Sequence, residues 1–222
     1  MKNIFLSTLA GCLLCANSVC WASRYNVDIQ GEYESWRSGL GGQSTALLAG
    51  LGVGYHGPKF FSGIGFVKGD YETEDHRDDT LQRTDVDLVI GYRLDQRLSI
   101  FAGYRFNQMK YNSDASGAKS FDENAHGLGG GVSFSAFIHE QWVLFGSAAL
   151  SFFSTKTQYD DDTANNSGNG YSLGTEGGVL FRMSQKTSIA LRLKYQTSEV
   201  NYDNGNWPNA YQRLGLQLSQ AF

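Results

Sequence analysis

Cysteine is nearly absent from this chain, because its 222 residues include only three and all of them precede Trp21. If that first segment is removed on export, no disulfide framework, thiol nucleophile or cysteine metal site remains. Proline is equally scarce, with two residues, whereas there are 27 glycines and 14% of the residues are aromatic. Scarce proline with abundant glycine and aromatic residues is typical of a chain built from many long strands.

Charge and long apolar runs are also in short supply. Only 18% of the residues are charged, and the formal net charge is -4. A mildly acidic chain gives no electrostatic footprint for nucleic acid, so a nucleic-acid partner is not expected. Beyond the first 22 residues no apolar run of about 18 residues occurs, which excludes an ordinary membrane helix from that part.

The first 22 residues have the pattern of a cleaved secretory signal. Lys2 supplies the positive start, residues 4–19 are mostly apolar, and Cys20-Trp21-Ala22 forms a small-x-Ala cleavage site. Lipoprotein processing at Cys12 is the alternative, since Leu9-Ala10-Gly11-Cys12 resembles a lipobox. We therefore expect residues 1–22 to be removed and residues 23–222 to form one domain.

Two alternating runs, Val86–Tyr92 and Leu98–Tyr104, are joined by the polar segment Leu94–Arg97. A period of two on both sides of a tight polar turn predicts an antiparallel hairpin. The strands are long, and their apolar faces end in tyrosine. This is the pattern of a transmembrane β-barrel, in which every backbone group is paired within a closed sheet.

The same pattern continues to the last residue and predicts an all-β, closed, antiparallel up-and-down barrel of ten strands, with eight or twelve as alternatives. Besides the hairpin within Arg83–Tyr111, the other strands are expected at about Tyr25–Trp36, Ala46–His56, Phe60–Tyr71, Asn124–Ile138, Trp142–Gln158, Tyr171–Arg182, from Ile189 to Gln196, and up to Phe222. Long polar loops alternate with short turns, which is typical of barrels with extracellular loops and periplasmic turns. Both termini then fall on the periplasmic side. The longest predicted loops are 72–82, 112–123, 159–170 and 202–208.

One parity of these strands carries charges of both signs. Its acids are Asp28, Glu32, Glu34, Asp85, Asp87 and Glu176, and its bases are Arg93, Arg105, Arg182, Arg192, Lys194 and Arg213. An arginine facing lipid at the membrane midplane costs about 2–4 kcal/mol, so this parity is predicted to face the lumen. The charges could line a pore that selects a solute, or they could pair with one another and plug a narrow lumen. Glycines on the same parity would leave one wall bare, either for the opposite arginines or for water.

The motifs Gly91-Tyr92-Arg93-Leu94, Leu98-Ser99-Ile100 and Gly103-Tyr104-Arg105-Phe106, with the terminal Phe222, resemble the small outer-membrane β-barrel superfamily, including OmpA-like and porin-like barrels. The resemblance covers nearly all of the chain after the signal. It implies a multi-pass protein of the bacterial outer membrane, in contact with membrane lipid and lipopolysaccharide and without a cofactor. It also implies recognition of Phe222 by the barrel-assembly machinery, although Gln220 departs from the apolar residue usual in that signal. The superfamily hosts pores, adhesins, enzymes and anchors, so the fold alone does not choose among them.

Three functional classes follow. A narrow passive pore or structural surface barrel is the first, a loop-mediated adhesin or surface receptor the second, and an outer-membrane hydrolase the third. The hydrolase rests on Asp85-Val86-Asp87, which invites comparison with the omptin proteases, although neither His76 nor His126 stands in an Asp-x-His pattern. No metal site is predicted; the acidic runs 72–79 and 160–166 offer oxygen ligands for Ca²⁺ or Mg²⁺, but without EF-hand spacing.

Overall fold

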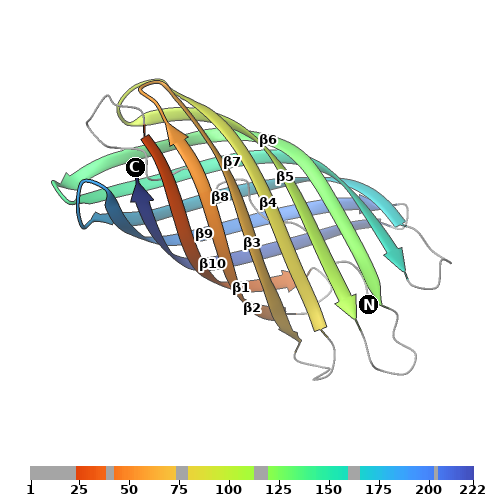
Figure 1. Ribbon diagram of the computed structural model, residues 1–222. Helices are drawn as coiled ribbons and strands as arrows, with labels where there is room; N and C mark the ends of the chain where they lie inside the picture. Colours follow the sequence, from red (N-terminus) through yellow and green to blue (C-terminus); the bar gives the residue numbers. More distant parts are fainter. Residues whose placement is uncertain (1–23, 39–42, 74–79, 113–119, 160–165, 203–204) are drawn as a thin grey trace.

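Ten antiparallel strands close into a barrel in the computed structural model of the chain (Figure 1). The structure describes residues 24–38, 43–73, 80–112, 120–159, 166–202 and 205–222. The strands are β1 (Arg24–Ser38), β2 (Gln43–His56), β3 (Phe60–Thr73), β4 (Thr80–Arg93), β5 (Leu98–Asn112), β6 (Phe121–His139), β7 (Trp142–Tyr159), β8 (Asn166–Arg182), β9 (Thr187–Tyr202) and β10 (Gly205–Ala221). The prediction of a ten-stranded closed barrel is confirmed. The predicted signal segment, residues 1–22, lies outside the described residues.

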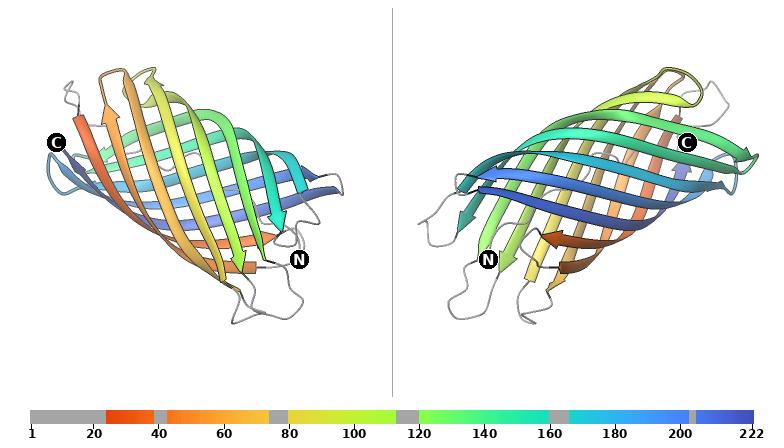
Figure 2. Two further views of the ribbon diagram at one scale, coloured as in Figure 1. Left: turned by 45° about the vertical axis from the view of Figure 1, so that its right-hand side comes forward. Right: turned by 180° about the vertical axis from the view of Figure 1, so that it is seen from behind.

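Each strand pairs with its neighbours in sequence, and β1 pairs with β10 to close the wall, as Figure 2 shows from two further directions. Side chains close the short turns. Asp95 accepts hydrogen bonds from the backbone N–H groups of Arg97 and Leu98, and Ser184 Oγ accepts from those of Lys186 and Thr187. Such local side-chain acceptors are the physical reason why Asp and Ser favour turns. We call this end of the barrel the turn end and the other the loop end.

The outer wall carries an apolar band between two rows of aromatic side chains. Leucine, isoleucine and valine face outward in its middle, for example Leu51, Leu88 and Leu216. At the turn end, outward aromatic residues meet across the strand pairs Tyr25–Tyr55, Phe60–Tyr92 and Trp142–Phe181, with ring centroids 5.3, 5.0 and 4.8 Å apart. Tyr33, Phe66, Phe152, Tyr171 and Tyr195 are exposed toward the loop end. Apolar side chains flanked by aromatic belts are the outer face of a barrel that spans lipid. No helix among the described residues is long and apolar enough to cross a membrane.

The strands are longer than the sequence pattern suggested, with 14 to 19 residues each. β3 runs to Thr73 and β4 begins at Thr80, so both ends of the predicted loop 72–82 are strand. The other long predicted loops are shortened in the same way, because β6, β8 and β10 begin at Phe121, Asn166 and Gly205. Trp207, expected in the last loop, lies in β10 and packs against Phe153, Val200 and Tyr202.

The polarity of the wall reverses along each strand, and this explains the misplaced loops. On β4 the outward residues are apolar at Leu88 and Ile90 but polar at Gln82 and Thr84, whereas Leu81 is buried inside. Near the loop end the barrel therefore has apolar residues inside and polar residues outside, like a water-soluble barrel. A search for lipid-facing strands expects apolar residues on the outer face. Strand segments with polar residues outside and apolar residues inside do not fit that pattern and are therefore predicted as loops.

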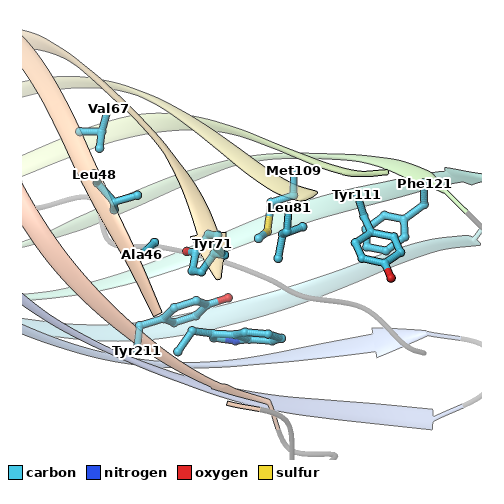
Figure 3. Packing of buried hydrophobic residues seen from close by; sticks show 10 residues of the cluster. Ala46, Leu48, Val67, Tyr71, Leu81, Met109, Tyr111, Phe121 and Tyr211 are labelled. Atoms are coloured by element: carbon cyan, nitrogen blue, oxygen red, sulfur yellow. The ribbon is translucent and has the colours of Figure 1, made fainter. Parts of the chain in front are cut away.

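We call this loop-end part the collar. Its buried side chains meet across the lumen and include a stacked pair, Tyr111 and Phe121, with ring centroids 5.3 Å apart (Figure 3). The collar interior consists of Trp36, Ala46, Leu48, Val67, Tyr71, Leu81, Met109, Tyr111, Phe121 and Tyr211, together with Ala125, Phe153, Val200 and Tyr202. Two smaller apolar clusters lie inside the barrel toward the turn end; one consists of Phe61, Val89, Phe101 and Ala149, and the other of Val143, Phe145, Leu180 and Ala190. Several residues of the predicted charged parity pair directly with collar residues in the sheet, as Glu32 does with Leu48 and Asp85 with Val67.

Candidate functional site in the barrel lumen

Glu34 on β1 is the centre of the polar contacts in the lumen. Its side chain is completely buried, and Arg83 Nη1 on β4 lies 2.7 Å from its Oε1. Arg213 on β10 donates to the other carboxylate oxygen, and the Tyr71 hydroxyl on β3 donates to Oε1. Four strands therefore converge on one carboxylate, and β4 is not a neighbour of β1 in the sheet.

Asp85 on β4 continues these contacts across the lumen. It accepts from Arg83 Nε at 3.0 Å, from the Asn107 amide, and from Arg213 Nη2 at 3.3 Å. β10 and β4 are separated by three strands in the wall, so the Arg213–Asp85 bond joins two distant parts of the barrel. Charge-assisted bonds of this kind fix geometry as well as adding energy.

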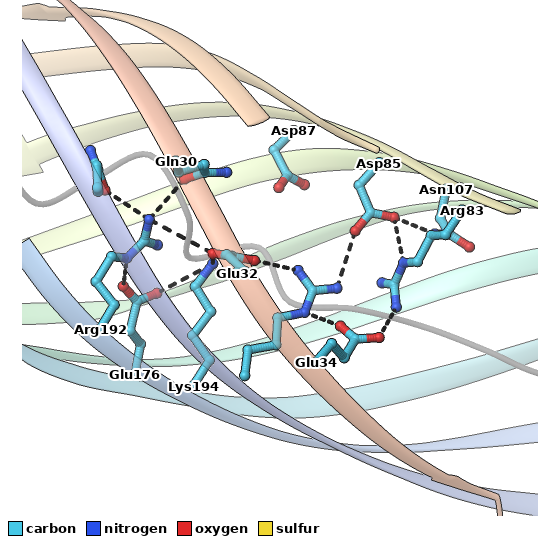
Figure 4. A network of polar contacts seen from close by, with 12 residues as sticks. Gln30, Glu32, Glu34, Arg83, Asp85, Asp87, Asn107, Glu176, Arg192 and Lys194 are labelled. Atoms are coloured by element: carbon cyan, nitrogen blue, oxygen red, sulfur yellow. Dashed lines mark hydrogen bonds and ion pairs between the residues drawn. The ribbon is translucent and has the colours of Figure 1, made fainter. Parts of the chain in front are cut away.

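The same network extends toward β8 and β9 (Figure 4). Arg192 Nε lies 2.7 Å from Glu176 Oε1, and its Nη1 donates to the side chains of Gln30 and Gln217 at 2.9 and 2.7 Å. Lys194 Nζ and Arg213 Nη1 reach the two oxygens of Glu32 at 3.0 and 3.1 Å. Arg105 forms a separate two-point pair with Asp87 on the neighbouring strand.

The charges in these contacts balance. We call the ten residues the charged layer; they are the acids Glu32, Glu34, Asp85, Asp87 and Glu176 and the bases Arg83, Arg105, Arg192, Lys194 and Arg213. All ten are buried. Breaking one partner of a buried ion pair leaves the other charge unpaired and costs about 3–5 kcal/mol, so the layer is held as a unit.

Three residues predicted for the lumen lie outside the charged layer. Asp28 is buried and accepts a hydrogen bond from the Asn26 amide at 2.8 Å, without an ion pair to another described residue. Arg93 is half-buried at the turn end, where its Nη1 donates to the Gly57 carbonyl at 2.8 Å. The Arg182 guanidinium stacks on the Phe137 ring, 4.7 Å from its centroid.

Sequence reasoning missed Arg83, Tyr71 and Glu123. Arg83 shares the parity of Asp85 and Asp87, and that signal could have found it, but it stood beside a predicted loop. Glu123 was assigned to a loop, yet it is completely buried in β6 and accepts from Thr157 and Thr155 hydroxyls at 2.9 and 3.3 Å. It has no cationic partner among the described residues.

The lumen glycines at 50, 52, 54, 63, 65, 127, 129 and 131 were expected to receive opposite arginines or water. Where contacts are resolved, side chains of neighbouring strands use the space instead. A Cβ on Gly131 would lie 2.7 Å from the Phe101 ring, and one on Gly50 would lie 2.7 Å from Gln30 Nε2. These glycines allow inward side chains to lie flat against the bare backbone of the next strand.

The described histidines do not join the lumen acids. His126 is exposed on the outer wall beside Tyr104, with ring centroids 6.4 Å apart, and His139 is exposed at the turn end. His56 is half-buried near the turn end and stacks on Phe61. His76 and most of the acidic runs 72–79 and 160–166 lie outside the described residues. Within the described ranges no group of three or more His, Cys, Asp or Glu side chains could hold a metal ion.

The closed wall and the apolar outer band define a small transmembrane β-barrel with a charged interior. Solved structures with this fold include the outer membrane protease OmpT from Escherichia coli, at 12% identity over 90% of this chain and 97% of that chain, with a TM-score of 0.56. The translocator domain of the autotransporter NalP from Neisseria meningitidis is 12% identical, covers 92% and 90%, and has a TM-score of 0.54. The β domain of the Bordetella autotransporter BrkA is 10% identical, covers 90% and 100%, and has a TM-score of 0.53.

The chain therefore has the fold of the small outer-membrane β-barrels. At 10–12% identity this likeness concerns the fold alone. No family model matches the sequence. No curated protein sequence matches it either.

Proposed function

We propose that this protein is a structural surface barrel of the bacterial outer membrane whose lumen is plugged by its own side chains. The contact from Arg213 on β10 to Asp85 on β4 carries the proposal, because it crosses the lumen between strands that are not neighbours. The apolar residues of the collar interior and the two apolar clusters toward the turn end add to the closure. A ten-stranded barrel is only slightly wider than the eight-stranded barrels that side chains fill completely.

The location in the outer membrane has four supports. The exposed apolar band with its aromatic belts fits a lipid bilayer, and the fold is that of outer-membrane barrels. The export pattern of residues 1–22 supplies a route across the inner membrane. Phe222 at the end of the last strand fits recognition by the barrel-assembly machinery. Lipid and lipopolysaccharide are then the surrounding molecules.

Conductance of the refolded chain in a planar bilayer tests the plug. We expect the wild-type protein to insert without discrete current steps. A Glu34→Ala, Arg213→Ala double variant should conduct, since it removes the contacts that join β1 and β10 to β4. Lys156→Gln, which removes an exposed outward charge, serves as the control and should stay silent. Ion-selective steps from the folded wild-type protein would instead establish a pore.

A hydrolase is not supported by the lumen geometry. Asp85 and Asp87 are each bound by arginine, so neither carboxylate is free to act as a general base. We expect no cleavage of a mixed peptide library by the refolded protein. Cleavage that disappears in a folded Asp87→Asn variant would overturn this part of the proposal.

A surface receptor or adhesin is the second candidate, and the collar favours it. There the strands continue past the apolar band with polar residues such as Lys110, Asp122 and Gln158 on the outer face. A rigid projecting wall is suited to present recognition residues. Whole cells that express the protein should lose a binding phenotype when these outward residues are replaced and keep it when only the lumen charges are changed.

A further inference from the structure

A pocket of about 310 Å³ lies on the outside of the barrel near the loop end. It spans β1, β8, β9 and β10 and is lined by Arg37, Tyr171, Thr197, Glu199, Pro208 and Ala210. This location is separate from the lumen and its charged layer, so the pocket stands independently of the plug proposed above.

The strand register explains why the wall is hollow here. Ala210 on β10 lies between Arg37 on β1 and Thr197 on β9, and its small side chain leaves space between them. In the row nearer the loop end, Pro208 pairs with Glu199, which in turn pairs with Tyr171. Pro208 lies next to Asn209, which pairs with Ser38 at the end of β1, and proline is tolerated near the end of a strand pair.

Two groups of opposite charge face this space from different strands. Glu199 is fixed, because it accepts hydrogen bonds from the Tyr171 hydroxyl at 2.8 Å and from Asn206 Nδ2 at 2.9 Å. Arg37 is exposed and makes no hydrogen bond or ion pair with another described residue. The pocket thus offers an oriented acceptor on one side and an unengaged guanidinium on the other.

We propose that this pocket binds one sugar unit that carries an anionic substituent. The guanidinium of Arg37 suits two-point pairing with a carboxylate or phosphate. The remaining lone pairs of Glu199 can accept from sugar hydroxyls, and Tyr171 with Pro208 provides apolar surface for the ring face. A concave site with a few convergent polar groups is the usual form of a small-ligand site. The sugar can belong to a soluble glycan or to the headgroup of a membrane glycolipid.

Calorimetry on the refolded protein in detergent micelles tests the chemistry, with glucuronate as the anionic probe and glucose as the neutral one. We expect glucuronate to bind more tightly than glucose. Arg37→Gln should weaken glucuronate binding by roughly tenfold and leave glucose unaffected. Ala210→Leu should abolish binding of both, because it fills the floor of the pocket. Lys156→Gln and Ala148→Leu make the same changes on the outer face of β7 and should bind like the wild-type protein.

A second arm separates the two sources of the sugar. Vesicles of zwitterionic phospholipid, with and without lipopolysaccharide, are titrated with the same variants. Binding of both soluble glucuronate and lipopolysaccharide supports a site open to free glycans, whereas Arg37-dependent binding of lipopolysaccharide alone supports a glycolipid headgroup. Equal binding of glucose and glucuronate, unchanged binding in Ala210→Leu, or no binding in either arm would overturn the proposal.

Discussion

Glu34 and Glu123 are both completely buried glutamates that face the same lumen, yet they lie in opposite surroundings. Glu34 is in the charged layer, where two arginines and a tyrosine hydroxyl contact it. Glu123 is in the collar, where two threonine hydroxyls are its hydrogen-bond donors. The outer face differs as well, since it is apolar in the middle of the barrel and polar around the collar. Burial alone therefore does not determine the role of an acid in the lumen. The side chains that surround the carboxylate determine it.

The largest expected effect is the loss of Glu34. Glu34→Gln leaves Arg83 and Arg213 without their shared carboxylate, so the free energy of unfolding should fall by about 3–5 kcal/mol. Urea titration of the protein in lipid vesicles measures this free energy of unfolding. Adding Arg83→Met to this variant should recover part of the loss, since it restores equal numbers of acids and bases in the charged layer, and Arg213 still pairs with Asp85. A change below about 1 kcal/mol in the single variant would contradict a cooperative charged layer.

The outer face gives the next comparison, on a single strand. Leu88→Arg places a charge in the middle of the apolar band and should destabilise the barrel by about 2–4 kcal/mol. Gln82→Arg places the same charge on the outer face of the collar and should cost about 0–1 kcal/mol. Equal losses in vesicle unfolding experiments would mean that lipid covers the collar as well.

Glu123→Gln should change the free energy of unfolding by less than about 1 kcal/mol. No described cation loses a partner, and the amide oxygen of glutamine can still accept from the Thr157 hydroxyl. The same urea titration, run beside Glu34→Gln, makes the comparison direct. A loss as large as that of Glu34→Gln would show that Glu123 has a charged role that the described contacts lack.

The smallest effect is expected at the exposed turn residue Asp95, which lies outside both layers. Hydrogen bonds from the backbone N–H groups of Arg97 and Leu98 lower the pKa of its carboxyl group. A lowered pKa means that the carboxylate stabilises the fold above the unfolded pKa of about 3.9 and that this contribution is lost as the pH falls. Asp95→Asn should be slightly less stable at pH 7, and the two unfolding midpoints should converge at low pH. A difference that grows on acidification would contradict this sign.

Much of the fold was predictable because the lipid environment imposes a strict rule. Each alternation such as Val86, Leu88, Ile90 places apolar residues on one face, and a shift of one residue would expose Asp85 and Asp87 to lipid. The strand number and the inward facing of the charged parity follow from that rule. This rule does not determine which residues of β7 face the lumen, because both parities are apolar. Val143 and Phe145 are inside, whereas Leu144 and Leu150 are outside.

The collar could not be predicted in the same way. Its polarity is opposite to that of the membrane band, so Thr80, Gln82 and Asp122 were predicted as loop residues although they lie in strands. The assignment of Arg83 to the lumen failed for a related reason, because the predicted loop ended at its neighbour Gln82. Local periodicity contains no information about where the membrane ends along a strand.

The sequence by itself determined a closed antiparallel barrel and favoured ten strands over eight or twelve, because an apolar outer band, aromatic belts and charged inner positions are compatible with little else in lipid. Only the tertiary structure decided which charges meet. Glu34 and Arg213 are 179 positions apart in the chain, and Arg213 and Asp85 are 128 apart. Strand closure brings them together, and the pairing of acids with bases across a lumen depends on strand tilt and side-chain reach that no single strand contains.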